Sequence, residues 1–207
     1  MIDVHPIEKV YTIAEYLARE DAGEQRHEFN NGIISEMAGG ILPHNAIKLR
    51  IAGLLDLLLE RRKMPHVACN SDTKVRIEAE NRFVYPDLTI SDGQPVYYRN
   101  PEGALRRDII INPLLIVEVL SDDTRAHDKS EKFDSYCTIP GFREYILIEP
   151  ETVWVKRYFL QDPANNLWHI QTITDRHATL KLESVNLEIS LTELYAVLDK
   201  LPKEGEA

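Results

Sequence analysis

The residue that most constrains the fold is Glu118, a lone carboxylate inside the apolar run of residues 114–120. The β-branched and aliphatic side chains of this run predict a strand that is buried on both faces. Burial of an ionised carboxylate is strongly unfavourable unless a metal ion, a cation or hydrogen bonds compensate its charge. The fold must therefore bring a compensating group to Glu118.

A second acid, Asp87, has a similar setting, because it lies inside the short apolar run of residues 84–90. Two acids on neighbouring strands predict a site for a hard divalent cation, since Mg²⁺ takes oxygen ligands and keeps several waters beside one or two carboxylates. Structural roles stay open for each acid alone. Glu118 can form a buried ion pair with Lys132, and Asp87 after Pro86 can be a turn or strand-entry residue.

The length of 207 residues and the hydrophobic content of 43% predict a single domain with one core. We expect a core over residues 11–160, a β extension with a short helix over 161–198 and a polar tail over 199–207. Cys69 and Cys137 are far apart and lack metal-site spacing, which disfavours a zinc ribbon or a disulfide framework. Without a signal-like start or a long apolar segment, we expect a cytoplasmic protein with no membrane span.

The net charge of −10 disfavours a protein that coats nucleic acid regardless of sequence, because phosphate binding depends on Lys and Arg. A nuclease is not excluded, because a basic cleft can exist on an acidic protein. Arg99, Arg106 and Arg107 are candidate phosphate contacts, and solvated surface is the simpler alternative.

Hydrophobic periodicity predicts an α/β domain in which helices flank a central mixed sheet. A capping box begins a helix at Thr12, and Asn-Gly at 31–32 predicts a hairpin turn. Residues 91–112 are rich in Gly, Pro, Tyr and Arg and predict an irregular excursion beside a substrate groove. The expected helices are 12–20, 43–63, 128–138 and 191–198. The expected strands are 26–30, 33–37, 67–70, 73–77, 83–90, 114–120, 143–148, 153–160, 167–173, 179–182 and 187–189.

The helix predicted over 128–138 follows the Glu118 strand and should pack back across the sheet. Either Lys129 or Lys132 can then extend toward Glu118. We favour Lys132, because it lies one turn before Tyr136 on the side of the helix that should be buried.

Other catalytic chemistries lack their motifs. The seven histidines show neither HExxH nor another paired i, i+4 placement, which disfavours a zinc hydrolase. Ser121 is not part of a GxSxG turn, which disfavours a serine hydrolase. A glycine-rich phosphate loop is also missing, so nucleotide-driven functions are disfavoured.

An ordered set of motifs runs over residues 11–160. Its members are Tyr11 to Leu17, His27 to Gly32, His44, Pro86-Asp87, Glu118 to Ser121, Asp128, Lys132, Tyr136 and Gly141 to Tyr145. This set resembles the Uma-two family of putative restriction endonucleases, in the PD-(D/E)XK nuclease superfamily. One departure is Leu120, which stands where the superfamily usually has its lysine, so the resemblance implies that Lys132 from the next helix supplies the amine.

The resemblance implies a restriction-endonuclease-like fold and a metal-dependent phosphodiesterase site. Asp87, Glu118 and the main-chain carbonyl of Val119 would bind Mg²⁺ or Mn²⁺. Lys132 would orient or activate the attacking water, with Glu28 as an outer carboxylate. For Glu28, a charge on the hairpin paired with Arg26 or a lysine is the alternative. Residues expected to line the site are His44, Ser121 and Asp128.

DNA is the substrate that the resemblance implies. A homodimer is compatible with the apolar late strands and would supply two sites for two strands. The alternative function is a catalytically silent module that binds nucleic acid or a protein on the same fold. An ammonium of Lys132 far from both acids would favour that silent module.

Overall fold

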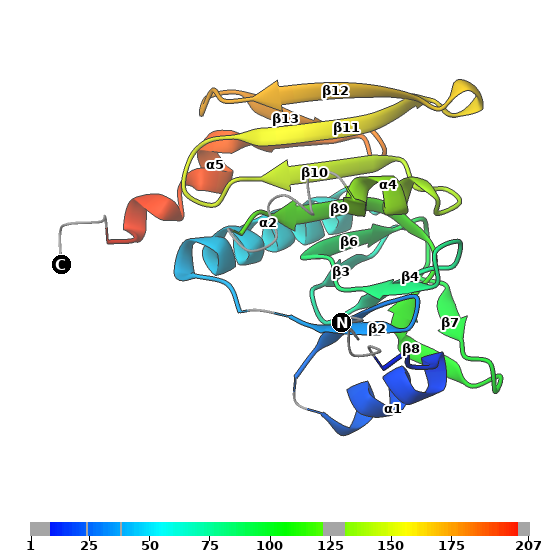
Figure 1. The fold of residues 1–207 in the computed structure, drawn as a ribbon. Coiled ribbons are helices and arrows are strands. Elements are labelled where there is room, and N and C mark those ends of the chain that lie inside the picture. The colour runs from blue at the N-terminus through cyan, green and yellow to red at the C-terminus, as the bar shows by residue number, and fades with distance from the viewer. Residues whose placement is uncertain (1–8, 24, 38, 122–130, 203–207) are drawn as a thin grey trace, which may run out of the picture.

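The computed structural model describes residues 9–23, 25–37, 39–121 and 131–202. Its strands form two six-stranded mixed sheets and a separate two-stranded sheet, with helices packed around them (Figure 1). The first sheet has the order β2-β1-β5-β4-β8-β7, and the second has the order β12-β11-β10-β9-β6-β3. The predicted α/β class with a mixed sheet is therefore confirmed, although the strands are divided between two sheets.

The N-terminal elements agree closely with the sequence prediction. Helix α1 (Ile13–Ala22) begins at a capping box, in which the side chain of Thr12 accepts a hydrogen bond from the amide of Glu15. Strands β1 (His27–Asn30) and β2 (Ile33–Glu36) form an antiparallel hairpin. At the turn between them both residues have positive φ, which Asn-Gly tolerates.

The long helix α2 (Leu42–Arg61) packs its apolar face on the second sheet. Its buried residues recur every three or four positions, as expected for a helix with one face in the core. The proline at the beginning of the helix needs no intrahelical donor there, so it starts the helix without loss. The buried residues are His44, Ile47, Ile51, Leu55 and Leu59.

Strand β9 (Pro113–Val119) lies in the middle of the second sheet, and all seven of its residues are buried. It pairs with β6 (Leu88–Ser91) in antiparallel orientation and with β10 (Glu144–Ile148) in parallel orientation. Val117 packs in the core cluster of α2, whereas Ile116 packs in a second cluster that includes Tyr136. The strand is therefore covered on both faces, as its composition predicted.

The strand predicted over residues 83–90 is interrupted in the structure. Strand β5 (Arg82–Val84) belongs to the first sheet, whereas β6 belongs to the second. Pro86 lies between them and has no backbone N–H to continue a ladder of hydrogen bonds. The break places Asp87 at the junction of the two sheets.

The irregular excursion predicted for residues 91–112 is wrong in part. This segment contains β7 (Tyr97–Arg99) and β8 (Leu105–Ile110), which pair with each other in antiparallel orientation. Strand β8 also pairs in parallel with β4 (Lys74–Ile77). Glycines and prolines at the turns concealed the strands, whose exposed residues give only a weak apolar signal.

The C-terminal third extends the second sheet and covers one face of it. A separate hairpin packs into the same core cluster as α2. Among the residues that the structure describes, no helix combines the length and apolar character needed to cross a membrane. The remaining elements are β3 (Ala68–Asn70), α4 (Glu131–Cys137), β11 (Val155–Asp162), a 3-10 turn (Pro163–Asn165), β12 (Leu167–Ile173), β13 (Thr179–Leu182), β14 (Leu187–Ser190), α5 (Leu191–Tyr195) and a 3-10 turn (Leu198–Lys200).

The two faces of α2 should differ sharply in their effect on stability. Leu55 is fully buried, so Leu55→Ala should lower the free energy of unfolding by about 2–5 kcal/mol through lost packing and a cavity. Leu49 on the same helix is 77% exposed, and Leu49→Ala should change stability by less than about 0.5 kcal/mol. Urea unfolding of both variants checks this, and equal losses would contradict the packing described here.

Candidate active site

The two predicted acids are neighbours in the structure. Strand β6 pairs with β9 so that Leu88 lies opposite Val117, and antiparallel pairing then brings Asp87 beside Glu118. The amide of Asp87 donates to Oε2 of Glu118 at 3.3 Å, and the amide of Val119 donates to Oδ2 of Asp87 at 2.8 Å. Two carboxylates that are 31 positions apart in sequence thus share one hydrogen-bonded site.

Helix α4 supplies the cation that compensates Glu118. Nζ of Lys132 lies 3.3 Å from Oε1 of Glu118, and the hydroxyl of Tyr136 donates to the same oxygen at 2.9 Å. Glu118 is 3% exposed and Lys132 is 6% exposed, so this charge pair is almost completely desolvated. Lys132 and Tyr136 are one helical turn apart and therefore reach the same carboxylate from one face of α4.

Helix α2 supplies two further groups on the side of Asp87. Nζ of Lys48 lies 3.2 Å from Oδ1 of Asp87, and Nε2 of His44 lies 3.5 Å from Oδ2. The two residues are four positions apart and thus project from the same face of the helix. The acids are held between α2 on one side and α4 on the other.

These contacts shift the pKa values of Asp87 and His44. Burial alone would raise the pKa of Asp87, but His44, Lys48 and the amide of Val119 together hold it below its usual value. The hydrogen bond with Asp87 raises the pKa of His44 against the opposing effect of burial. Asp87 is consequently a carboxylate at neutral pH.

Glu28 approaches the site from β1. Its Oε1 lies 3.6 Å from Nζ of Lys132 and accepts a long hydrogen bond from the amide of Tyr85 at 3.5 Å. Arg26, one of the partners considered for Glu28, instead forms an ion pair with Asp72. Glu28 is thus paired with a lysine, the second of its two expected partners, and this lysine also contacts Glu118. Its role as an outer carboxylate stays a prediction.

A cavity of about 490 Å³ opens onto these residues. Its walls combine the acids with groups from α2 and α4, and the glycines before α2 form part of its rim. The predicted site-lining residues His44 and Ser121 both face this space, whereas Asp128 lies outside the described residues. The polar lining that matters for chemistry is His44, Lys48, Asp87, Glu118, Ser121 and Lys132.

The three arginines proposed as phosphate contacts lie elsewhere. They are on β7 and β8, and none of them lines the cavity formed by the described residues. Arg106 forms ion pairs with Asp21 and Asp108, and Arg99 donates to the carbonyl of Gly103. Arg107 is exposed. Any contact of these residues with a phosphate would lie away from the acids.

The two acids can bind only a divalent ion that keeps most of its water ligands, as Mg²⁺ does. Within the described part of the chain, three or more His, Cys, Asp and Glu side chains do not cluster as a ligand set. A closed protein cage is therefore not built, but Mg²⁺ commonly needs only one or two carboxylates. Asp87 and Glu118 meet that requirement. Val119 contacts Asp87 through its amide, and its carbonyl stays a proposed third ligand.

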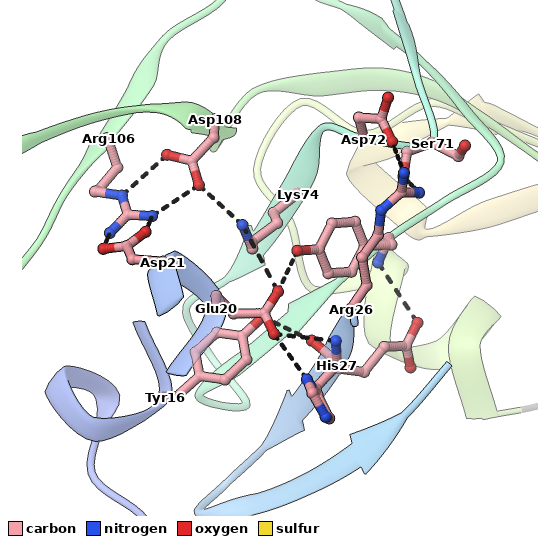
Figure 2. A network of polar contacts seen from close by, with 12 residues as sticks. Tyr16, Glu20, Asp21, Arg26, His27, Ser71, Asp72, Lys74, Arg106 and Asp108 are labelled. Carbon is pink, nitrogen blue, oxygen red and sulfur yellow. Dashed lines mark hydrogen bonds and ion pairs between the residues drawn. The ribbon is translucent and has the colours of Figure 1, made fainter. Parts of the chain in front are cut away.

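A second polar network supports the site from the side of α1 and β1 (Figure 2). Glu20 accepts hydrogen bonds from both the amide and Nδ1 of His27, and it also bonds to the hydroxyl of Tyr85. Lys74 extends from Glu20 to Asp108, with 2.8 Å to the latter. Since Tyr85 is two residues before Asp87, this network holds the segment from which Asp87 projects.

Comparison with known proteins places the chain in a family. The family model named Uma2, described as "Putative restriction endonuclease", matches residues 13–193. The chain belongs to the Uma2 family. This Uma2 match includes every described residue of the acid site. Two Synechocystis relatives are similar: the uncharacterized protein sll1609 is 30% identical over 86% of this chain and 96% of that protein. The uncharacterized protein slr1290 is 29% identical over 87% of this chain and 89% of that protein.

The fold of this Uma2 protein also matches a solved structure. A crystal structure from Anabaena variabilis, described as a "putative nuclease belonging to DUF820", has a TM-score of 0.69 to it. The match covers 90% of this chain and 98% of the other. The sequence identity is 18%, so this likeness concerns the fold. The resemblance inferred from the motifs is confirmed by the family model, and the match to this solved structure supports the fold.

Sequence reasoning missed Lys48. The sequence does contain a signal for it, because Lys48 follows His44 by one helical turn, so both side chains project from the same face of the helix. The apolar periodicity of α2 indicates only its core residues. The contact of Lys48 with Asp87 depends on the position of Asp87 at the junction of the two sheets. Only the tertiary structure reveals that position.

The network of Figure 2 predicts a pH-dependent stability. Burial would raise the pKa of Asp108, but Arg106 and Lys74 hold it well below its usual range. A carboxyl with a depressed pKa stabilises the fold above its ordinary pKa, and this contribution disappears as the pH falls toward the folded-state pKa. Asp108→Asn should therefore lower the free energy of unfolding by about 1–2 kcal/mol at pH 7, a value reduced for partial exposure, and by less at pH 3.

Urea unfolding at pH 7 and pH 3 measures this difference. Asp56→Asn is the control, because Asp56 is an exposed carboxylate of α2 outside the network. A loss for Asp108→Asn that is equal at both pH values would contradict the proposed ion-pair origin.

Proposed function

We propose that the chain is a divalent-metal-dependent DNA endonuclease that hydrolyses phosphodiester bonds. The observation that supports this most directly is the meeting of Asp87, Glu118 and Lys132 around one cavity. Two carboxylates that can hold a divalent ion, with an amine beside them, can together support metal-assisted phosphodiester hydrolysis. The membership of the Uma2 family supports the same class of reaction.

The acid pair would hold Mg²⁺ or Mn²⁺ through Asp87 and Glu118, with the carbonyl of Val119 as a third ligand. The bound ion would polarise the phosphoryl group and lower the pKa of its water. The hydrogen bond from the amide of Val119 fixes the carboxylate of Asp87 in orientation. Because that bond comes from the backbone of β9, the two acids stay in register with each other.

Lys132 contributes a fixed positive charge beside the acids. It would orient the attacking water and offset negative charge that develops on the phosphoryl oxygens. Its burial between Glu118 and Glu28 keeps the ammonium in place and excludes bulk water from it. Glu28 thus acts on the reaction through Lys132 and is a positioning residue in this scheme.

Tyr136 orients Glu118. Its hydroxyl donates to the carboxylate oxygen that also faces Lys132. The aromatic ring is fully buried and contacts the rings of Phe142 and Tyr145, so the hydroxyl has little freedom to move. Such outer contacts fix the direction from which a carboxylate can meet a metal ion.

The competing function was a silent binding module, which predicts that the ammonium of Lys132 lies far from the acids. A separation of 3.3 Å between Nζ of Lys132 and Glu118 favours the nuclease. DNA is the proposed substrate, in agreement with the family description. The exposed Leu167 and Ile170 on the edge strand β12 support the proposal of a homodimer that could act on both strands.

Isosteric changes at the three central residues test the function. Asp87→Asn, Glu118→Gln and Lys132→Met should each reduce Mg²⁺-dependent nicking of supercoiled DNA at least about 100-fold, because each removes a charge on which the transition state depends. Lys156→Met is the matched control, since Lys156 lies on β11 outside the cavity. Gel assays with Mg²⁺, Mn²⁺ and EDTA measure the rates, and circular dichroism verifies folding. Equal cutting by all variants would refute the assignment.

Removal of the Tyr136 hydroxyl should have a smaller effect. Tyr136→Phe keeps the ring packing but deletes the donor to Glu118, so we expect about a 10-fold to 100-fold lower cleavage rate. The same nicking assay gives this rate over a range of Mg²⁺ concentrations. A full rate in Tyr136→Phe would show that Lys132 alone positions the carboxylate.

A further inference from the structure

Lys48 is a charged residue of the cavity for which the hydrolytic scheme has no use. Its ammonium lies 3.2 Å from Oδ1 of Asp87, on the opposite side of the acids from Lys132. An ion held by Asp87 would need the oxygen that Lys48 now contacts. The ammonium and a divalent ion therefore compete for the same carboxylate.

The two lysines of the cavity differ in accessibility. The side chain of Lys132 is 8% exposed and lies between two carboxylates, whereas that of Lys48 is 26% exposed. Lys48 lies in the first half of α2, and its side chain reaches the cavity through four flexible methylene groups. Of the two, Lys48 is the one that an incoming ligand can meet directly.

A metal ion at Asp87 would let Lys48 bind a second partner, a phosphate group. The charge of Lys48 is offset by the carboxylate of Asp87 before any ligand arrives. A dication at Asp87 would compensate that carboxylate in place of Lys48, and the ammonium would then be available to an anion such as a phosphodiester.

We propose that Lys48 is a phosphate-binding residue that pairs with Asp87 in the metal-free protein and with a DNA phosphate when metal occupies the acids. This inference rests on the proposed function and adds a substrate contact to it. The exchange couples the two ligands, because metal binding releases the group that binds the phosphate. Lys48 thereby makes DNA binding depend on prior occupancy of Asp87.

The exchange has a signature that a merely structural lysine lacks. Removing the ammonium should strengthen metal binding, because a competitor for Asp87 is lost, and should weaken DNA binding, because a phosphate contact is lost. A residue that only supports the fold would weaken both. The two affinities therefore change in opposite directions under the proposed role, and a salt slope that falls by one phosphate contact separates this role from a general loss of positive charge.

Lys48→Met tests this with two binding measurements and no cleavage assay. Calorimetry with Mn²⁺ should show affinity on the order of tenfold higher than in the unchanged protein. Binding of a fluorescent 20-base-pair duplex, measured in Ca²⁺ at several salt concentrations, should be weaker. The slope of log affinity against log salt should become shallower by about 0.9, the value for one lost phosphate contact.

Two further variants serve as references. Lys48→Arg keeps the charge and should retain the DNA affinity and the salt slope of the unchanged protein. Lys181→Met removes an exposed lysine of β13 outside the cavity and should change neither affinity.

Weaker Mn²⁺ binding by Lys48→Met, or an unchanged salt slope, would overturn the proposal. Absence of any duplex binding in the unchanged protein would overturn it as well. Failure of the nuclease proposal looks different: DNA then binds with the expected salt slope, but no metal supports cleavage.

Discussion

The desolvated contact between Glu118 and Lys132 is the constraint on which the rest of the site depends. A carboxylate in the middle strand of a sheet cannot stay ionised there unless a cation and donors reach it. Lys132, Tyr136 and the amide of Asp87 supply them from two separate segments. One buried charge therefore helps to fix two parts of the fold. These are the position of α4 over the sheet and the approach of the segment around Asp87 to β9.

Pro86 gives the second acid its unusual position. Because a proline cannot continue the ladder, the chain leaves the first sheet after β5 and enters the second at β6. Asp87 falls in the interval, where its side chain is free to turn toward α2 and its amide toward Glu118. A continuous strand would have alternated its side chains between the two faces and left Asp87 fixed to one of them.

The predictable parts of the molecule were those set by local pattern. The capping box of α1, the Asn-Gly hairpin and the doubly buried β9 all follow from short-range sequence, and Lys132 followed from its place beside Tyr136 on a single helix face. The division into two sheets, the strand β8 and the contact of Lys48 with Asp87 depend on long-range pairing. Local composition does not encode such pairings, and in residues 91–112 the turn residues concealed them.

The side chains proposed for the chemistry also hold the fold together, which sets a limit on how the site can change. Asp87 is held by groups from α2 and Glu118 by groups from α4, so the acids join elements on both faces of the second sheet. Removing one member of such a buried set leaves its partner charge without compensation, which costs more than the contact itself contributes. Under the proposed exchange, a metal ion would replace Lys48 at Asp87 without this cost, because it would bring its own positive charge. On that proposal the site tolerates an exchange of cations far better than the loss of one.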